Sequence, residues 1–306
     1  MSKPHIHATK MPFNLHCSGG ASPQTRRRDT WCMLTAAACL AAALAVDYPR
    51  AVRAAEKPGT RGTAVAERVV PTPSRPPARG LDDALKLAYQ CRAIYARLDD
   101  YTARFLKRER LGDELSELNH IDLKVRRRPF SVYMRWAQPS EGREALYVEG
   151  QRGGKLLAHD TGVTRFFTGT MELDPTGSIA LRASRHPITE AGIGNLIERV
   201  IAGWEQDRRW GNTEATVIPG AQVHDRKCWC IQTRHAVHDP RLQTYRVRMF
   251  VDERLTLPIR IEVYDWPRRG GPPDGEVIEE YTYLNLRLNQ RLTDVDFRSD
   301  NPAYGF

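Results

Sequence analysis

The stretch KVRRRPFSVYMRWAQP, Lys124 to Pro139, decides between two kinds of fold and of function. Four cations fall within five residues, and aromatic and apolar side chains then recur at every second position. This alternation is typical of a β-strand, whose side chains point to its two faces in turn. Proline is tolerated at both ends of such a strand. The apolar face consists of Phe130, Val132, Met134 and Trp136.

The arginines of this stretch suit either a nucleic-acid surface or the turn of a β-hairpin. The formal net charge of the 306 residues is +9, but the excess lies in the first 80 residues. From Leu81 onward there are 34 Lys and Arg against 33 Asp and Glu, and no motif of a nucleic-acid-binding module occurs. We therefore expect Arg126–Arg128 to connect two strands of a twisted sheet, and we expect no nucleic-acid partner.

Residues 1–45 have the pattern of a secretory signal peptide. Three arginines precede an apolar run from Trp31 to Val46, which is too short to span a bilayer comfortably. Ala43 and Ala45 provide the small-residue pair of a cleavage site. The alternative, a short buried helix, has no preceding segment to pack against. We expect export to the periplasm or elsewhere in the cell envelope.

Two further divisions follow along the chain. Residues 46–80 are rich in proline and arginine without apolar periodicity, which predicts a disordered, extended tether. Residues 81–306 are expected to form a single α+β domain. LDDALKLAYQCRAIYARLDDY and ITEAGIGNLIERVIAGWEQDRRW have apolar residues three and four apart and predict two amphipathic helices. The remaining segments alternate as antiparallel strands, and the last stretch is a turn-rich cap anchored by Phe297.

The cysteines fit an oxidising compartment. Cys17, Cys32 and Cys39 belong to the leader, which leaves Cys91, Cys228 and Cys230 in the domain. One disulfide and one odd thiol are then expected. A bridge between residues two apart is strained, so pairing of Cys91 with Cys228 or Cys230 is favoured. Three unpaired buried thiols are the alternative.

Sequence motifs of catalysis and metal binding are missing. Cys228 and Cys230 share one strand face with His224, but C-x-C is not the usual zinc spacing. No G-x-S-x-G, H-E-x-x-H or Walker sequence occurs. Several glutamates have the residue type that a hydrolase needs in pairs, although solvated strand faces with arginine partners explain them better. These are Glu109, Glu144, Glu149, Glu279 and Glu280. We expect a protein that is not an enzyme, with no metal and no cofactor.

Four segments together resemble a known superfamily. They are YTARFLKRERLGDELSELNHIDLKVRRRPFSVYMRW, GREALYVEGQRGGKLLAH, YRVRMFVDERLTLPIRIEVYDWP and EEYTYLNLRLNQRLTDVDF. With the leader, the chain resembles the bacterial lipoprotein carriers (LolA and LolB), and within them an uncharacterised family of secreted domains. The resemblance covers about residues 81–306. It implies a strongly curved antiparallel sheet, an incomplete barrel of about 10–11 strands, with helices covering the concave face.

The same resemblance implies a ligand. A half barrel of this kind holds a lipid or lipoprotein acyl chain, and a membrane-associated envelope partner is also expected. Core packing is the alternative role for each apolar position on the concave face. If the interior is fully packed, the function is that of an envelope structural or protein-interaction module. The candidate lining residues are Phe130, Val132, Met134, Trp136, Tyr147, Phe166 and Met249.

Overall fold

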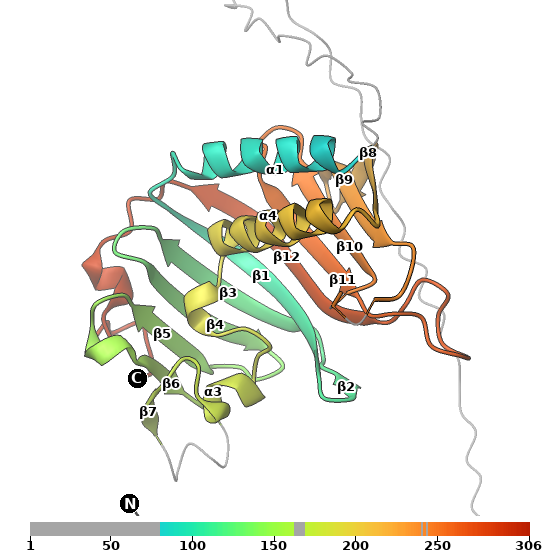
Figure 1. The fold of residues 1–306 in the computed structure, drawn as a ribbon. Coiled ribbons are helices and arrows are strands. Elements are labelled where there is room, and N and C mark those ends of the chain that lie inside the picture. Colours follow the sequence, from blue (N-terminus) through green and yellow to red (C-terminus); the bar gives the residue numbers. More distant parts are fainter. Residues whose placement is uncertain (1–79, 162–168, 240, 243) are drawn as a thin grey trace, which may run out of the picture. The chain divides into compact units, whose positions relative to one another are not determined.

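The computed structural model describes residues 80–161, 169–239, 241, 242 and 244–306. The expected signal peptide, nearly all of the expected tether, and Phe166 lie outside these residues. Helix α1 (Leu81–Tyr95) is the first described element (Figure 1). Its first turn holds Asp82 and Asp83, which complement the positive end of the helix dipole. Its inward side chains, among them Leu85 and Cys91, are buried.

A meander of short antiparallel strands follows α1. Two of its hairpins turn at residues with positive φ, Gly112 after β1 and Gly150 after β5, where a side chain would be strained. A single turn of 3-10 helix, η1 (Arg152–Gly154), precedes β6. The strands are β1 (Asp100–Leu111), β2 (Glu114–Leu115), β3 (Asn119–Arg126), β4 (Ser131–Gln138), β5 (Glu144–Val148), β6 (Leu156–His159) and β7 (Thr170–Leu173).

Helical segments then cross to the far edge of the sheet. They are α3 (Ser178–Arg182), η2 (Ile188–Glu190) and α4 (Ile193–Trp210). Gly194 lets α4 approach α1, because a Cβ there would lie 2.2 Å from the Tyr95 ring. Five strands complete the sheet before η3 (Asp294–Phe297). They are β8 (Thr213–Val223), β9 (Arg226–His235), β10 (Arg246–Asp252), β11 (Pro258–Tyr264) and β12 (Val277–Leu288).

All strands belong to one antiparallel sheet. In the described part of the chain, eleven strands follow the order β7-β6-β5-β4-β3-β1-β12-β11-β10-β9-β8, and the twelfth, β2, pairs only with β1. Strands β1 and β12 are neighbours at the centre although they are far apart in sequence. Figure 1 shows the sheet curving around α4, with α1 beside it. The expected α+β half barrel is confirmed, with one short strand more than expected.

The two faces of the sheet are covered differently. The concave face forms the main core with α1 and α4. The outer face has a small cluster where the segment after β12 packs on β4, β5 and β6, and it includes Phe297. The outer face also has a ladder of ion pairs, in which Arg260 contacts Glu262 at 2.8 Å and Glu280 at 2.7 Å.

The arginines of the opening stretch lie in the β3–β4 hairpin, as expected. Arg126 ends β3, and Arg127 and Arg128 are in the turn. Arg127 donates to the carbonyls of Ala96 and Leu98, just beyond the end of α1. The turn therefore satisfies carbonyls that the helix leaves without partners.

The favoured disulfide is not found. Cys91, Cys228 and Cys230 are buried free thiols in the described chain. Cys91 lies in the core under α1, whereas Cys228 and Cys230 belong to a cluster on the outer face. Because strand side chains alternate between faces, the sheet separates the two β9 sulfurs from Cys91. The alternative of three unpaired thiols describes the structure.

Candidate ligand-binding site

A pocket of about 260 Å³ lies on the concave face. The long helices α1 and α4 contact each other and pack toward β8 and β11. Among the described elements, only the short helices α3 and η2 and the start of α4 cover strands β4 to β7 on this face. These elements do not fill the space beneath them. The cavity thus results from unequal helix cover along one continuous sheet.

Most of the pocket wall is apolar. Strands β4, β5, β6 and β7 contribute residues from one side, and α3, η2 and α4 contribute from the other. Binding sites for drug-sized molecules usually measure about 300–1,000 Å³, so this pocket is small. The apolar lining residues are Phe105, Met134, Trp136, Ala145, Leu156, Ala158, Met171, Leu173, Pro175, Ile179, Ala180, Ala183, Pro187, Ile188, Ala191 and Leu196.

Two of the residues expected from the sequence line this pocket, namely Met134 and Trp136. Val132 and Met249 are fully buried in the core and line no part of it. Phe130 contacts the ring of Tyr147 at 6.2 Å between ring centroids, away from the pocket lining. Alternation along a strand predicts which face a side chain occupies. It does not predict which stretch of that face the helices leave open.

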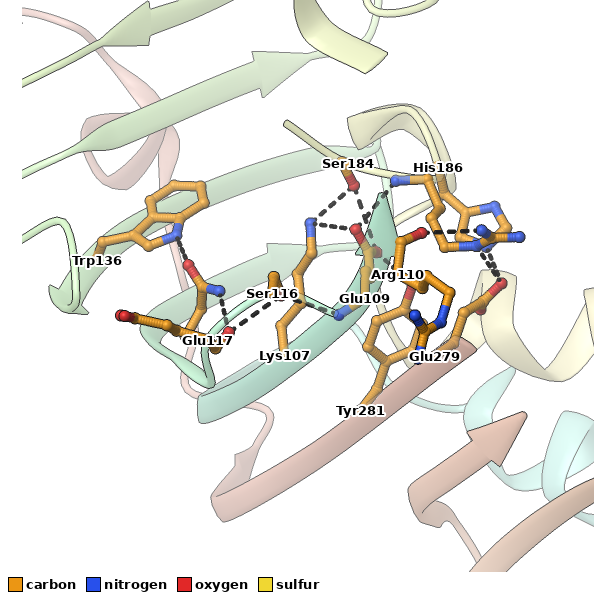
Figure 2. A network of polar contacts seen from close by, with 12 residues as sticks. Lys107, Glu109, Arg110, Ser116, Glu117, Trp136, Ser184, His186, Glu279 and Tyr281 are labelled. Atoms are coloured by element: carbon orange, nitrogen blue, oxygen red, sulfur yellow. Dashed lines mark hydrogen bonds and ion pairs between the residues drawn. The ribbon is translucent and has the colours of Figure 1, made fainter. Parts of the chain in front are cut away.

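A network of polar groups lies where β1 and β12 border the pocket (Figure 2). Its centre is Glu109 on β1, which is 2% exposed. The carboxylate of Glu109 is 3.1 Å from Lys107 Nζ and accepts hydrogen bonds from the Tyr281 hydroxyl and the Arg185 backbone N–H. Lys107 Nζ also donates to Ser184 Oγ at 2.7 Å. The charge of Glu109 is therefore neutralised inside the protein.

A second buried carboxylate continues the network. Glu279 on β12 is paired directly opposite Glu109 and is 7% exposed. It accepts from Arg185 Nε at 3.2 Å and contacts His186 Nε2 at 3.0 Å. Burial alone would raise the pKa of Glu279, but His186 and the nearby arginines lower it below its ordinary value. A carboxylate held in its ionised form is no proton donor at neutral pH.

Sequence reasoning missed this network. Glu109 and Glu279 were expected on solvated strand faces, and both are buried. Glu144 is also buried, at 2% exposed, and accepts from the Gly305 backbone N–H. The position of Glu109 could have been predicted from the alternation along β1, because Glu109 lies four residues after Phe105 and so points to the same, inward face of the strand. Glu280, with the opposite parity to Glu279, has the expected arginine partners.

Two negative findings concern the described residues alone. Among them, no group of three or more His, Cys, Asp or Glu side chains is placed to hold a metal ion. No helix formed by the described residues is both long enough and apolar enough to cross a membrane.

The fold and pocket define a class of protein: a helix-covered antiparallel half barrel with a small apolar cavity. The chain belongs to a family described as "Protein of unknown function (DUF1571)", whose match covers residues 98–306. This agrees with the expectation of an uncharacterised family. No curated protein matches the sequence significantly.

Three solved structures illustrate the similarity of the fold. A putative outer membrane lipoprotein-sorting protein domain from Vibrio parahaemolyticus is 11% identical, with TM-score 0.35, over 72% of this chain and 98% of that one. The Mycobacterium tuberculosis lipoprotein LppX is 13% identical, with TM-score 0.40, over 69% and 98%. A LolA superfamily protein from Nitrosomonas europaea is 13% identical, with TM-score 0.30, over 71% and 98%.

Proposed function

We propose that this protein binds a lipid, an acyl chain or another hydrophobic ligand in the concave pocket and acts in the cell envelope without catalysing a reaction. The observation that carries the proposal is the apolar cavity between β4–β7 and the α3–η2 segment. Such a protein would take part in lipid or lipoprotein trafficking. The membrane, or an envelope protein at the membrane, would supply or receive the ligand.

The composition of the pocket supports this class of ligand. Apolar side chains form most of the wall, so that burying an alkyl chain removes apolar surface from water on both partners. The small volume suits one chain rather than a whole two-chain lipid.

The neighbouring polar groups support binding rather than catalysis. Glu109 and Glu279 are both engaged by cationic and neutral donors, and the lowered pKa of Glu279 is the opposite of what a general acid requires. Lys107 Nζ, which donates to Ser184 Oγ at 2.7 Å, is ion-paired with Glu109.

Native mass spectrometry after expression with export to a bacterial periplasm tests the proposal. We expect a stoichiometric acyl-chain adduct that a fluorescent fatty acid displaces. The intact mass also tests export, because cleavage after Ala45 leaves a chain that begins at Val46.

A pocket-filling variant sharpens the same test. Ala158→Trp places an indole in the cavity and should abolish the adduct, whereas Ala202→Trp on the exposed side of α4 should retain it. Circular dichroism checks that both variants fold. If the wild type carries no ligand and binds no probe, the proposal is wrong, and the interaction module with a packed interior takes its place.

A further inference from the structure

The buried polar groups of the pocket have spare hydrogen-bond donors, whereas their acceptors are already used. Two of the pocket carboxylates have several donors. Glu109 has four donors, from Lys107, Tyr281, Ser184 and the Arg185 backbone. Asp160 accepts two bonds from Arg143, at 3.0 and 2.9 Å. Glu144 accepts from the Gly305 backbone. Glu190 also lines the pocket, but its side chain is half exposed and has only long ion pairs, with His186 at 3.5 Å and Arg199 at 3.6 Å. A ligand with hydrogen-bond donors would therefore find the buried acceptors already occupied.

Three donors at the pocket wall have capacity to spare. Arg199 on α4 makes no hydrogen bond to a described residue. It forms an ion pair with Glu190 at 3.6 Å, a distance that is too long for a hydrogen bond. The Tyr283 side chain is 4% exposed, and its hydroxyl has no hydrogen-bond partner among the described residues. Lys107 uses two of its three N–H groups, on Ser184 and Glu109.

These donors come from adjoining positions. Lys107 is paired opposite Tyr281 on the β1–β12 ladder, and the next inward-facing pair is Phe105 opposite Tyr283. The ring of Tyr283 stacks on Phe105 at 4.9 Å, which fixes its direction. Burial raises the pKa of the Tyr283 hydroxyl, and the charge of Arg199 opposes that rise, in agreement with a guanidinium close to the phenol.

We infer that the ligand is a single-chain carboxylate, a free fatty acid, with its carboxylate against Arg199, Tyr283 and Lys107 and its chain along the apolar wall. This inference rests on the proposed function and names its ligand. An ionised carboxylate has acceptors only, which matches the spare donors of Arg199, Tyr283 and Lys107. Arginine binds carboxylates with strong, charge-assisted hydrogen bonds. The pocket volume of about 260 Å³ admits one chain.

The test compares three ligands of equal chain length by isothermal titration: laurate, methyl laurate and dodecylamine. Wild type should bind laurate at least about tenfold more tightly than the ester or the amine, because a hydrogen bond to a charged group contributes about 1.5–3 kcal/mol. Equal affinity for laurate and its methyl ester, or tighter binding of the amine, would overturn the inference and leave the proposed function standing. Absence of binding by all three would contradict the proposed function itself.

Variants assign the effect to the named side chains. Arg199→Gln should weaken laurate binding about tenfold or more and leave methyl laurate unchanged. Tyr283→Phe retains the ring on Phe105 and should weaken laurate to a smaller extent. Arg208→Gln is the matched control, since Arg208 lies on the same helix, is exposed and has one long ion pair, at 3.4 Å with Asp82. A uniform loss for laurate and its ester in both pocket variants would indicate a purely structural role and contradict the inference.

Discussion

Glu109 and Glu279 occupy directly opposite positions on β1 and β12. Like charges at such positions destabilise a sheet. They are tolerated here because Lys107, Arg185 and His186 surround them with donors and positive charge. Arg185 and His186 belong to the segment that closes one side of the pocket. The glutamates thus tie this segment to the sheet.

Removing the charge of Glu109 should destabilise the protein. Glu109→Gln keeps the side-chain shape but leaves Lys107, whose side chain is 13% exposed, without its anionic partner. Breaking a buried ion pair costs about 3–5 kcal/mol, so we expect the free energy of unfolding in urea to fall by about 3 kcal/mol. Glu114→Gln, at an exposed position of β2, should change it by less than about 0.5 kcal/mol. Equal effects of the two substitutions would contradict the role of Glu109.

His235 should make stability depend on pH. Burial alone would lower the pKa of His235, but the Asp207 carboxylate, 3.2 Å from Nε2, and the Thr244 carbonyl raise it above its ordinary value. The folded state then binds the proton more tightly than the unfolded state. The stabilisation is complete below the ordinary value of about 6.5 and is lost as the pH rises through the folded-state value.

Melting temperatures measured between about pH 5 and about pH 8 check this prediction. The difference between wild type and His235→Gln should be largest at the acidic end and should shrink as the pH rises. His224→Asn, at an exposed position of positive φ, is the control and should show no such trend. A difference that grew with pH would contradict the assignment.

At the scale of elements, the segment from η3 onward serves as a cap for the outer face. Phe297 is 2% exposed, and the guanidinium of Arg126 lies 4.9 Å from the centre of its ring. Tyr304 stacks on Tyr133 at 3.8 Å. The sequence-based expectation of a turn-rich cap anchored by Phe297 is confirmed. Its docking site on β4–β6 was not predictable, because no local pattern specifies which distant surface a turn contacts.

Truncating the anchor should loosen the cap. Phe297→Ala removes a buried ring and should lower the free energy of unfolding by about 3–5 kcal/mol. The control is Val295→Ala in the same short helix, because Val295 is 55% exposed and its truncation should cost less than about 0.5 kcal/mol. Urea denaturation measures both. Similar losses for the two variants would show that the cap does not depend on Phe297.

At the scale of the whole domain, the separation of the thiols by the sheet can be tested chemically. Burial raises the pKa of the Cys91 and Cys228 thiols to about 12, and it also raises that of Cys230. Buried neutral thiols react slowly. Iodoacetamide should leave all three unmodified in the native protein and modify all three in denaturant, as judged by peptide mass spectrometry. Two cysteines that resist alkylation in denaturant until reduced would indicate a disulfide instead.

The sequence predicted the class of fold and the strand faces, because period-two alternation is a local property. It did not separate Met134, in the pocket, from Val132, in the core, since both occupy the same face of β4. It also did not bring Glu109 and Glu279 together. Their contact depends on the pairing of β1 with β12, and nothing in either segment alone specifies the partner strand.

The central position of β1 and β12 has a consequence for the order of events during biosynthesis. The first strand of the domain has its neighbour on one side almost at once, in β3, but must wait for β12 on the other. Long-range pairing of this kind slows folding. The half of the sheet from β7 to β1 therefore lacks its partner strand β12 until the last part of the chain has been made.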